Sequence, residues 1–168
     1  MRFFISLAII AFSIVVFTPN SSQAGTVVSY KGLAKGSILV KTSKRRLYLG
    51  LGNGKASSYP VGVGRTGKQW SGDRRIRSKR IKPAWKPTAQ IRRDNPNIAK
   101  VIPGGSPKNP MGAAALVLSG SGQYAIHGTN KPGSIGGFVS YGCIRMYNKD
   151  IMHLYSRVGV GARVTVTN

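Results

Sequence analysis

The chain has 168 residues, which is enough for one hydrophobic core and too few for two comfortable domains. It carries 26 Lys and Arg, three acidic residues and one cysteine, with a formal net charge of +23. One cysteine excludes an intrachain disulfide framework, and three scattered aspartates nearly exclude the carboxylate pair of a glycosidase. The charge favours anionic partners, but zinc-finger spacing, basic-zipper heptads and an aromatic RNA-binding signature are all missing, so no specific nucleic acid is expected.

The first 24 residues have the pattern of a signal peptide. Arg2 precedes an apolar run over 3–17, and small residues at Ser22 and Ala24 suit cleavage before Gly25. The run is shorter than the roughly 20 apolar residues that a membrane-spanning helix needs, so an uncleaved anchor is the weaker alternative. We expect an exported protein of the periplasm or cell wall, whose mature part, 25–168, is a single domain.

Short apolar segments separated by Gly, Pro, Asn and Ser predict a mainly β domain. Turns are expected at 43–45, at Asn53-Gly54, at Tyr59-Pro60 and over 119–122. The expected strands cover 37–42, 46–51, 61–64, 113–118, 124–127 and 163–167.

A basic run over 74–86 also has β character. Alternation along a strand would place Ile76, Ser78 and Arg80 on one face, with the apolar members of the run pointing inward. We interpret the run as a basic outer face and not as a dedicated ligand site.

Six prolines between Lys82 and Pro110 exclude regular central strands there. We expect a long irregular excursion with one helical turn near 88–93, and long ordered loops are often functional. Near the C-terminus, Ile151, Leu154, Tyr155 and Val158 have the spacing of one buried helical face. Asn148 is predicted to be the N-cap of that helix, with Asp150 in its first turn.

Cys143 is the candidate nucleophile, because a thiol becomes reactive when an imidazole or a positive field stabilises its thiolate. His127 ends an apolar strand and is followed by Gly128, which makes it the better candidate base, although a structural role is the alternative. His153 should point away from the apolar helix face, as a solvated side chain. No metal-ligand spacing and no Gly-x-Ser-x-Gly elbow is present, which leaves cysteine acyl transfer.

The sequence resembles the YkuD-like L,D-transpeptidases of bacterial cell walls from about Ile38 onward. One departure is Tyr141, where many members of that family have histidine. The motifs that carry the resemblance are Ile126-His127-Gly128-Thr129, Gly133-Ser134-Ile135-Gly136, Ser140-Tyr141-Gly142-Cys143-Ile144-Arg145-Met146, Asp150 and Gly161-Ala162-Arg163-Val164, with Leu47-Tyr48-Leu49, Tyr59-Pro60-Val61-Gly62-Val63-Gly64, Gln69-Trp70-Ser71-Gly72, Pro83-Ala84-Trp85 and Asn109-Pro110-Met111-Gly112 upstream.

The resemblance implies a β-sandwich-like fold with one short C-terminal helix after the cysteine. It implies that Cys143 attacks the acyl bond before the terminal D-alanine of a peptidoglycan tetrapeptide stem, forms a thioester and transfers the acyl group to an amine. His127 would accept and return the proton. No cofactor and no metal is implied.

The same resemblance suggests roles for the residues around the thiol. Backbone N–H groups near Tyr141, Gly142 and Cys143 would hold the oxyanion, and Arg145 would bind a substrate carboxylate, favour the thiolate or form a structural ion pair. Ser140 and Thr129 would shape the site by hydrogen bonds, and the Gly128 carbonyl would orient His127.

Two other functions remain open at the level of sequence. The chain could be a catalytically silent basic protein that binds the wall, or an L,D-carboxypeptidase in which water is the acceptor. The expected partners are peptidoglycan stem peptides and, through the charge, an anionic wall or membrane surface.

Overall fold

The computed structural model describes residues 24–168, so the predicted signal peptide lies, apart from Ala24, outside the described residues. The fold is mainly β, as predicted. No helix among the described residues is long and apolar enough to cross a membrane. The strands are β1 (Thr26–Ser29), β2 (Ile38–Lys41), β3 (Arg46–Gly52), β4 (Lys55–Pro60), β5 (Val63–Gly64), β6 (Gly72–Ile81), β7 (Ala114–Leu118), β8 (Ala125–His127), β9 (Phe138–Ser140), β10 (Ile144–Arg145) and β11 (Arg163–Thr167).

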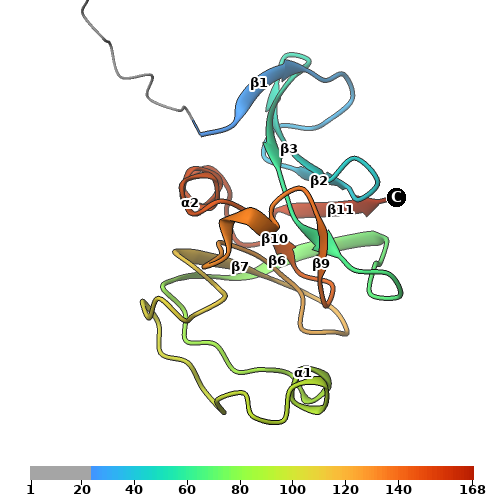
Figure 1. The fold of residues 1–168 in the computed structure, drawn as a ribbon. Helices are drawn as coiled ribbons and strands as arrows, with labels where there is room; N and C mark the ends of the chain where they lie inside the picture. Colours follow the sequence, from blue (N-terminus) through green and yellow to red (C-terminus); the bar gives the residue numbers. More distant parts are fainter. Residues whose placement is uncertain (1–23) are drawn as a thin grey trace, which may run out of the picture.

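Nine strands form one sheet in the order β1-β4-β3-β2-β11-β6-β7-β8-β10, and β5 pairs with β9 separately (Figure 1). The last strand, β11, lies between β2 and β6, parallel to the first and antiparallel to the second. It therefore joins the N-terminal strands to the half of the sheet that ends in β8 and β10. Those two strands are parallel, with Arg145 opposite His127.

The core is built from the apolar side chains of both halves of the sheet and of α2 (Asn148–Tyr155). Helix α2 contacts β7 and β8 and buries Ile151 and Leu154, as its periodicity predicts. Val164 and Val166 of β11 are also buried, on one face of their strand. Helix α2 thus packs against β8, which is the strand that ends in His127.

All six predicted strand regions contain strands, but the interval after the Asn53-Gly54 turn was predicted wrongly. Tyr59 and Pro60 do not form a turn, because they end β4, which pairs with both β3 and β1. The Ser-rich segment 55–60 lacks clear apolar alternation, so its pairing depends on strands distant in sequence. The strand β1 was not predicted, and the segment 61–64 supplies only the short β5.

The predicted alternation along β6 is also wrong. A register shift between Ile76 and Ser78 breaks the alternation, so Ile76 is buried whereas Arg80 is exposed. Ile81, predicted to point inward, is 49% exposed. Lys79 does not belong to a freely solvated face, because its ammonium group donates to two carbonyls at the end of α2, each at 2.7 Å.

The excursion over 82–110 has the predicted irregular course. Its helix α1 (Ala89–Asp94) begins after Thr88, whose hydroxyl accepts a hydrogen bond from the Ile91 N–H. Trp85 and Ile102 form an isolated bridge within the excursion. Figure 1 shows α1 in this segment, below the sheet. A one-turn 3-10 helix, Pro132–Ser134, was not predicted.

Candidate active site

The parallel pairing of β8 with β10 brings the candidate residues to one edge of the sheet. Arg145 lies opposite His127 in the register, and Cys143 immediately precedes β10. On the other side of β10, the Arg145 N–H donates to the Gly62 carbonyl at 2.8 Å and the Gly62 N–H donates back at 2.9 Å. The backbone around the thiol is therefore held from both sides.

His127 is almost completely buried, with 4% of its surface exposed. Its Nδ1 donates to the Gly128 carbonyl at 2.6 Å, so in the neutral ring Nε2 is the unprotonated nitrogen. Burial lowers the pKa of His127 to about 4, and the positive charge of Arg145 acts in the same direction. At neutral pH the ring is uncharged, and a backbone contact with Pro110 acts on it in addition to the Gly128 carbonyl. The predicted contact between His127 and the Gly128 carbonyl is present.

Cys143 is half-buried, and its thiol contacts the Gln123 carbonyl at 3.7 Å. Among the described residues, no hydrogen bond joins the thiol to His127. Burial raises the pKa of the Cys143 thiol, while the nearby Arg145 charge acts to lower it. The resting state therefore has a protonated thiol, whose polar contact is with the Gln123 carbonyl and not with the His127 ring. Apo sites are often looser than the reacting complex in this way.

The loop before the thiol is fixed by hydrogen bonds to its backbone. The Ser140 hydroxyl donates to the Cys143 carbonyl at 2.6 Å and accepts from the Gly142 N–H at 3.0 Å. The indole N–H of Trp70, a residue that the sequence analysis did not assign to the site, donates to the Gly142 carbonyl at 2.8 Å. Of the three predicted oxyanion donors, the Gly142 N–H is thus already engaged in this conformation.

Gly142 could not carry a side chain. Its φ is +116°, and a Cβ would lie 2.4 Å from a carbon of the Tyr124 ring. Tyr124 stacks on Trp70, with ring centroids 4.9 Å apart and planes 5° from parallel. This aromatic pair packs against the loop and sets its path.

Arg145 is partly buried and poorly satisfied. Its Nη1 lies 3.5 Å from the Ser134 hydroxyl, and its buried Nε has no hydrogen-bond partner among the described residues. Burial lowers the pKa of its guanidinium, and no acidic side chain among residues 24–168 forms an ion pair with it. The structural ion pair considered for Arg145 does not form, which leaves a cation near the thiol with unused hydrogen-bonding capacity.

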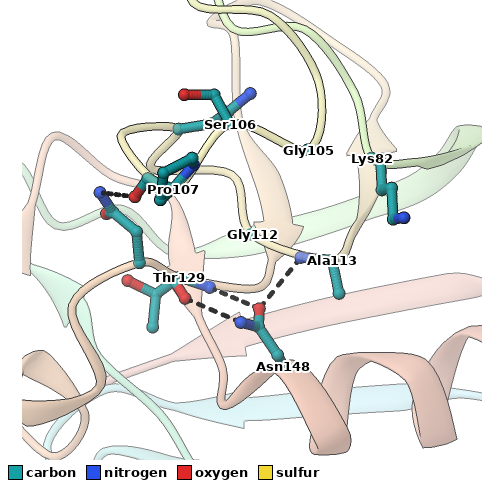
Figure 2. A pocket seen from close by; sticks show the side chains of 10 residues that line it. Lys82, Gly105, Ser106, Pro107, Gly112, Ala113, Thr129 and Asn148 are labelled. Atoms are coloured by element: carbon teal, nitrogen blue, oxygen red, sulfur yellow. Dashed lines mark hydrogen bonds between the residues drawn. The ribbon is translucent and has the colours of Figure 1, made fainter.

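Thr129 and Asn148 form a second network beside His127 (Figure 2). The Asn148 Oδ1 accepts from the Ala113 and Thr129 N–H groups at 3.0 and 3.1 Å, and its amide donates to the Thr129 carbonyl at 3.0 Å. Asn148 is therefore not the predicted N-cap, because Tyr147 holds that position and makes no side-chain cap. Only the fold, which brings 113 and 129 together, reveals this role.

The network forms one wall of an open pocket of about 300 Å³. Figure 2 shows Lys82 and Ser106 of the excursion on the other walls. Thr129 is the one predicted site residue that lines this pocket. The pocket lies beside the histidine loop and does not contain the thiol.

His153 is not the solvated side chain that was predicted. Its Nδ1 lies 2.7 Å from the Tyr59 hydroxyl, and the two rings meet edge to face. Burial lowers its pKa. The tyrosine comes from β4, a strand that no local pattern predicts, so this partner could not be expected from the sequence. Among residues 24–168, no group of three His, Cys, Asp or Glu side chains is arranged to hold a metal ion.

Comparison with known proteins defines the class to which this fold belongs. An L,D-transpeptidase structure from Mycobacterium smegmatis matches with a TM-score of 0.63, at 17% identity, over 87% of this chain and 69% of that chain. A Brucella melitensis structure described as a probable carnitine operon oxidoreductase matches with a TM-score of 0.57, at 34% identity, over 89% and 96% of the respective chains. The word oxidoreductase describes the Brucella protein and is not carried over to this chain.

The sequence comparisons assign the family. The model of the YkuD L,D-transpeptidase catalytic domain matches residues 35–166, and the chain belongs to this family. A probable L,D-transpeptidase of Salmonella typhimurium, ErfK/SrfK, is 35% identical over 90% of this chain and 51% of its own length. The chain spans about half the length of the curated relatives it matches.

Proposed function

We propose that the protein is a peptidoglycan L,D-transpeptidase that works through a thioester on Cys143. One observation carries the proposal: the β8–β10 register places a buried histidine and an unpaired guanidinium at the strand edge that holds the only thiol. A nucleophile, a base and a cation are the groups that acyl transfer from a carboxylate-bearing peptide needs. Family membership supports the same reaction class.

In the first half-reaction, the Cys143 sulfur attacks the carbonyl carbon of the third residue of a tetrapeptide stem. The thiol proton passes to Nε2 of His127, which is unprotonated because Nδ1 donates to the Gly128 carbonyl. Collapse of the tetrahedral intermediate breaks the peptide bond, and the imidazolium gives the proton to the D-alanine amine as it leaves. The products are a thioester and free D-alanine.

In the second half-reaction, an amine of another stem or of an anchored protein attacks the thioester. The amine loses one proton to His127, the C–S bond breaks, and the sulfur recovers a proton. If water replaces the amine, the same steps give the carboxypeptidase reaction. The acceptor therefore decides whether the enzyme crosslinks, anchors or trims.

Arg145 is assigned to the substrate carboxylate. The terminal D-alanine of a tetrapeptide carries a free carboxylate close to the bond that breaks. A guanidinium without an acidic partner, whose Nε is buried and unsatisfied, gains the most from such a ligand. The assignment also explains why a partly buried cation lies two residues from the thiol.

The charge supports a location at the wall. Without Arg2, which lies in the predicted signal peptide, the net charge of +23 falls by one to +22. Such a surface concentrates anionic polymers around an exported enzyme. We therefore place the protein in the periplasm or cell wall, against an anionic wall or membrane surface.

Replacement of the thiol tests the proposal. The wild-type protein is expected to release D-alanine from purified tetrapeptide stems and to gain the mass of one carbapenem molecule, whereas Cys143→Ala should do neither. The matched control is Ser156→Ala, a hydroxyl-to-methyl change on the exposed side of the C-terminal end of α2. D-alanine release that persists in Cys143→Ala would contradict the mechanism. A folded wild-type protein with no adduct and no release would favour the silent wall-binding alternative.

A further inference from the structure

Asp94 makes a polar contact between the excursion 82–110 and Tyr141 of the catalytic loop, by which we mean residues 140–143. Its Oδ2 accepts a hydrogen bond from the Tyr141 hydroxyl at 2.6 Å and forms an ion pair with Arg65 at 2.9 Å. The Arg65 guanidinium lies 4.0 Å from the centre of the Tyr141 ring. We call these three residues the Asp94 cluster. Each pair among the three is in contact, so the cluster is closed.

The cluster joins three separate parts of the chain. Asp94 is the last residue of α1, Arg65 follows β5, and Tyr141 lies between β9 and Cys143. The Arg65 N–H also donates to the Ser140 carbonyl at 2.9 Å, so the backbone of Arg65 is held beside the loop independently of its side chain. Asp94 therefore pairs with an arginine whose backbone is itself bonded to the loop.

Other contacts of α1 do not explain its position. The helix buries none of its residues. Within it, Gln90 donates to the other oxygen of Asp94 at 2.8 Å, so both carboxylate oxygens are occupied. A helix without a buried face needs polar contacts to keep a fixed place. The Asp94 cluster supplies them on the side of the catalytic loop.

Acidic residues are rare in this chain, and Asp94 is one of them. Only three are present among 168 residues, and Arg65–Asp94 is the one ion pair within 4.0 Å among residues 24–168. Exposed ion pairs contribute little to global stability, and Asp94 and Arg65 side chains are 30% and 44% exposed. The contact is therefore better placed to orient a local segment than to stabilise the fold.

We propose that Asp94 is a positioning residue, which holds the Tyr141 side chain and with it the Tyr141–Gly142–Cys143 backbone in the arrangement needed for acylation. This inference rests on the proposed function. Tyr141 directly precedes the glycine whose carbonyl Trp70 holds, so Asp94 fixes the side-chain end of a loop whose backbone is already held.

A double-mutant cycle tests the coupling. Asp94→Ala and Tyr141→Phe should each lower kcat/KM for D-alanine release by about fivefold, the effect of one orienting hydrogen bond, mainly through kcat. The double variant should be no worse than Asp94→Ala alone, because Tyr141→Phe removes a hydrogen bond that Asp94→Ala has already removed. Asp94→Glu should restore part of the rate. The control is Lys100→Ala, an exposed position of the same excursion.

Limited proteolysis gives a readout that does not need activity. Trypsin should cut after Arg92 or Arg93 faster in Asp94→Ala and Tyr141→Phe than in the wild type or Lys100→Ala, with unchanged global stability. Additive kinetic losses, or cleavage rates that do not change, would overturn the inference. If cleavage follows the cluster while the wild-type protein releases no D-alanine and takes up no carbapenem, the contact stands and the proposed function is what fails.

Discussion

Cys143 and His127 are both neutral in the resting protein, because burial opposes the charged form of each. The pKa of the thiol is raised, and that of the imidazole is lowered to about 4. The site therefore does not hold a preformed thiolate–imidazolium pair. In the proposed mechanism, proton transfer accompanies the approach of substrate, and Arg145 is the one charge that acts on both groups.

This protonation state predicts a pH profile. The rate of carbapenem acylation should change little from pH 6 through pH 8, because the proposed mechanism uses a neutral thiol and a neutral imidazole, and both are the resting forms over this range. No inflection is expected near the ordinary histidine pKa of about 6.5, since His127 stays neutral down to about pH 4. Stopped-flow absorbance or intact mass at timed intervals measures the rate. A rise of about tenfold per pH unit over this range would contradict the mechanism, because it would mean that free thiolate reacts without His127 as base.

At the scale of elements, Asn148 ties the start of α2 to the loop after β8. Its amide bridges Ala113 and Thr129, and its Oδ1 lies so close to Gly112 and Gly128 that a Cβ on either would be 2.2 Å away. The two glycines let the backbone approach the amide. The position of the histidine loop thus depends on a helix that begins some twenty residues later.

Removal of this amide should loosen the loop. Asn148→Ala loses three hydrogen bonds at a partly exposed site, and we expect a loss of about 2 kcal/mol in the free energy of unfolding. Asn148→Asp keeps both acceptor contacts and loses only the donor to Thr129, so its loss should be smaller. Urea denaturation measures both, with Met152→Ala on an exposed position of α2 as the control. Equal stability of Asn148→Ala and the wild type would contradict the bridging role.

The elements that sequence patterns predicted are those in which the buried residues repeat with the period of the element itself. Helix α2 and β11 were found because Ile151, Leu154, Val164 and Val166 repeat with the period of their element. The strand β4 was missed because its Ser-rich stretch is stabilised by two neighbouring strands and not by its own alternation. The bulge in β6 likewise arises from pairing with β7, so it could not be read from the basic run.

For the whole molecule, the excess of cations has a direct consequence. With three acidic residues and one ion pair among residues 24–168, most positive charges remain uncompensated. Some have structural roles, such as Lys79 at the end of α2, but many lie on the surface. The field of such a surface extends about one Debye length, roughly 10 Å at 0.1 M salt.

Binding to isolated sacculi should therefore depend on salt. The fraction of protein bound should fall steeply between about 0.05 and 0.5 M salt, because the Debye length shortens over this range. Cosedimentation with the Cys143→Ala variant, which should not form the thioester, separates this adhesion from covalent capture. Binding that is unchanged across the salt range would refute the electrostatic account.

The sequence by itself determined the residue types and the local periodicity, and these were enough for the family, the mainly β fold, the single thiol and its candidate base. The roles of these residues stay predictions until the variants are measured. Only the tertiary structure decided their partners: Tyr59 for His153, Asn148 for Thr129, and Asp94 for Tyr141. Each of these contacts joins residues far apart in the chain, and no local pattern encodes which distant segments a folded sheet brings together.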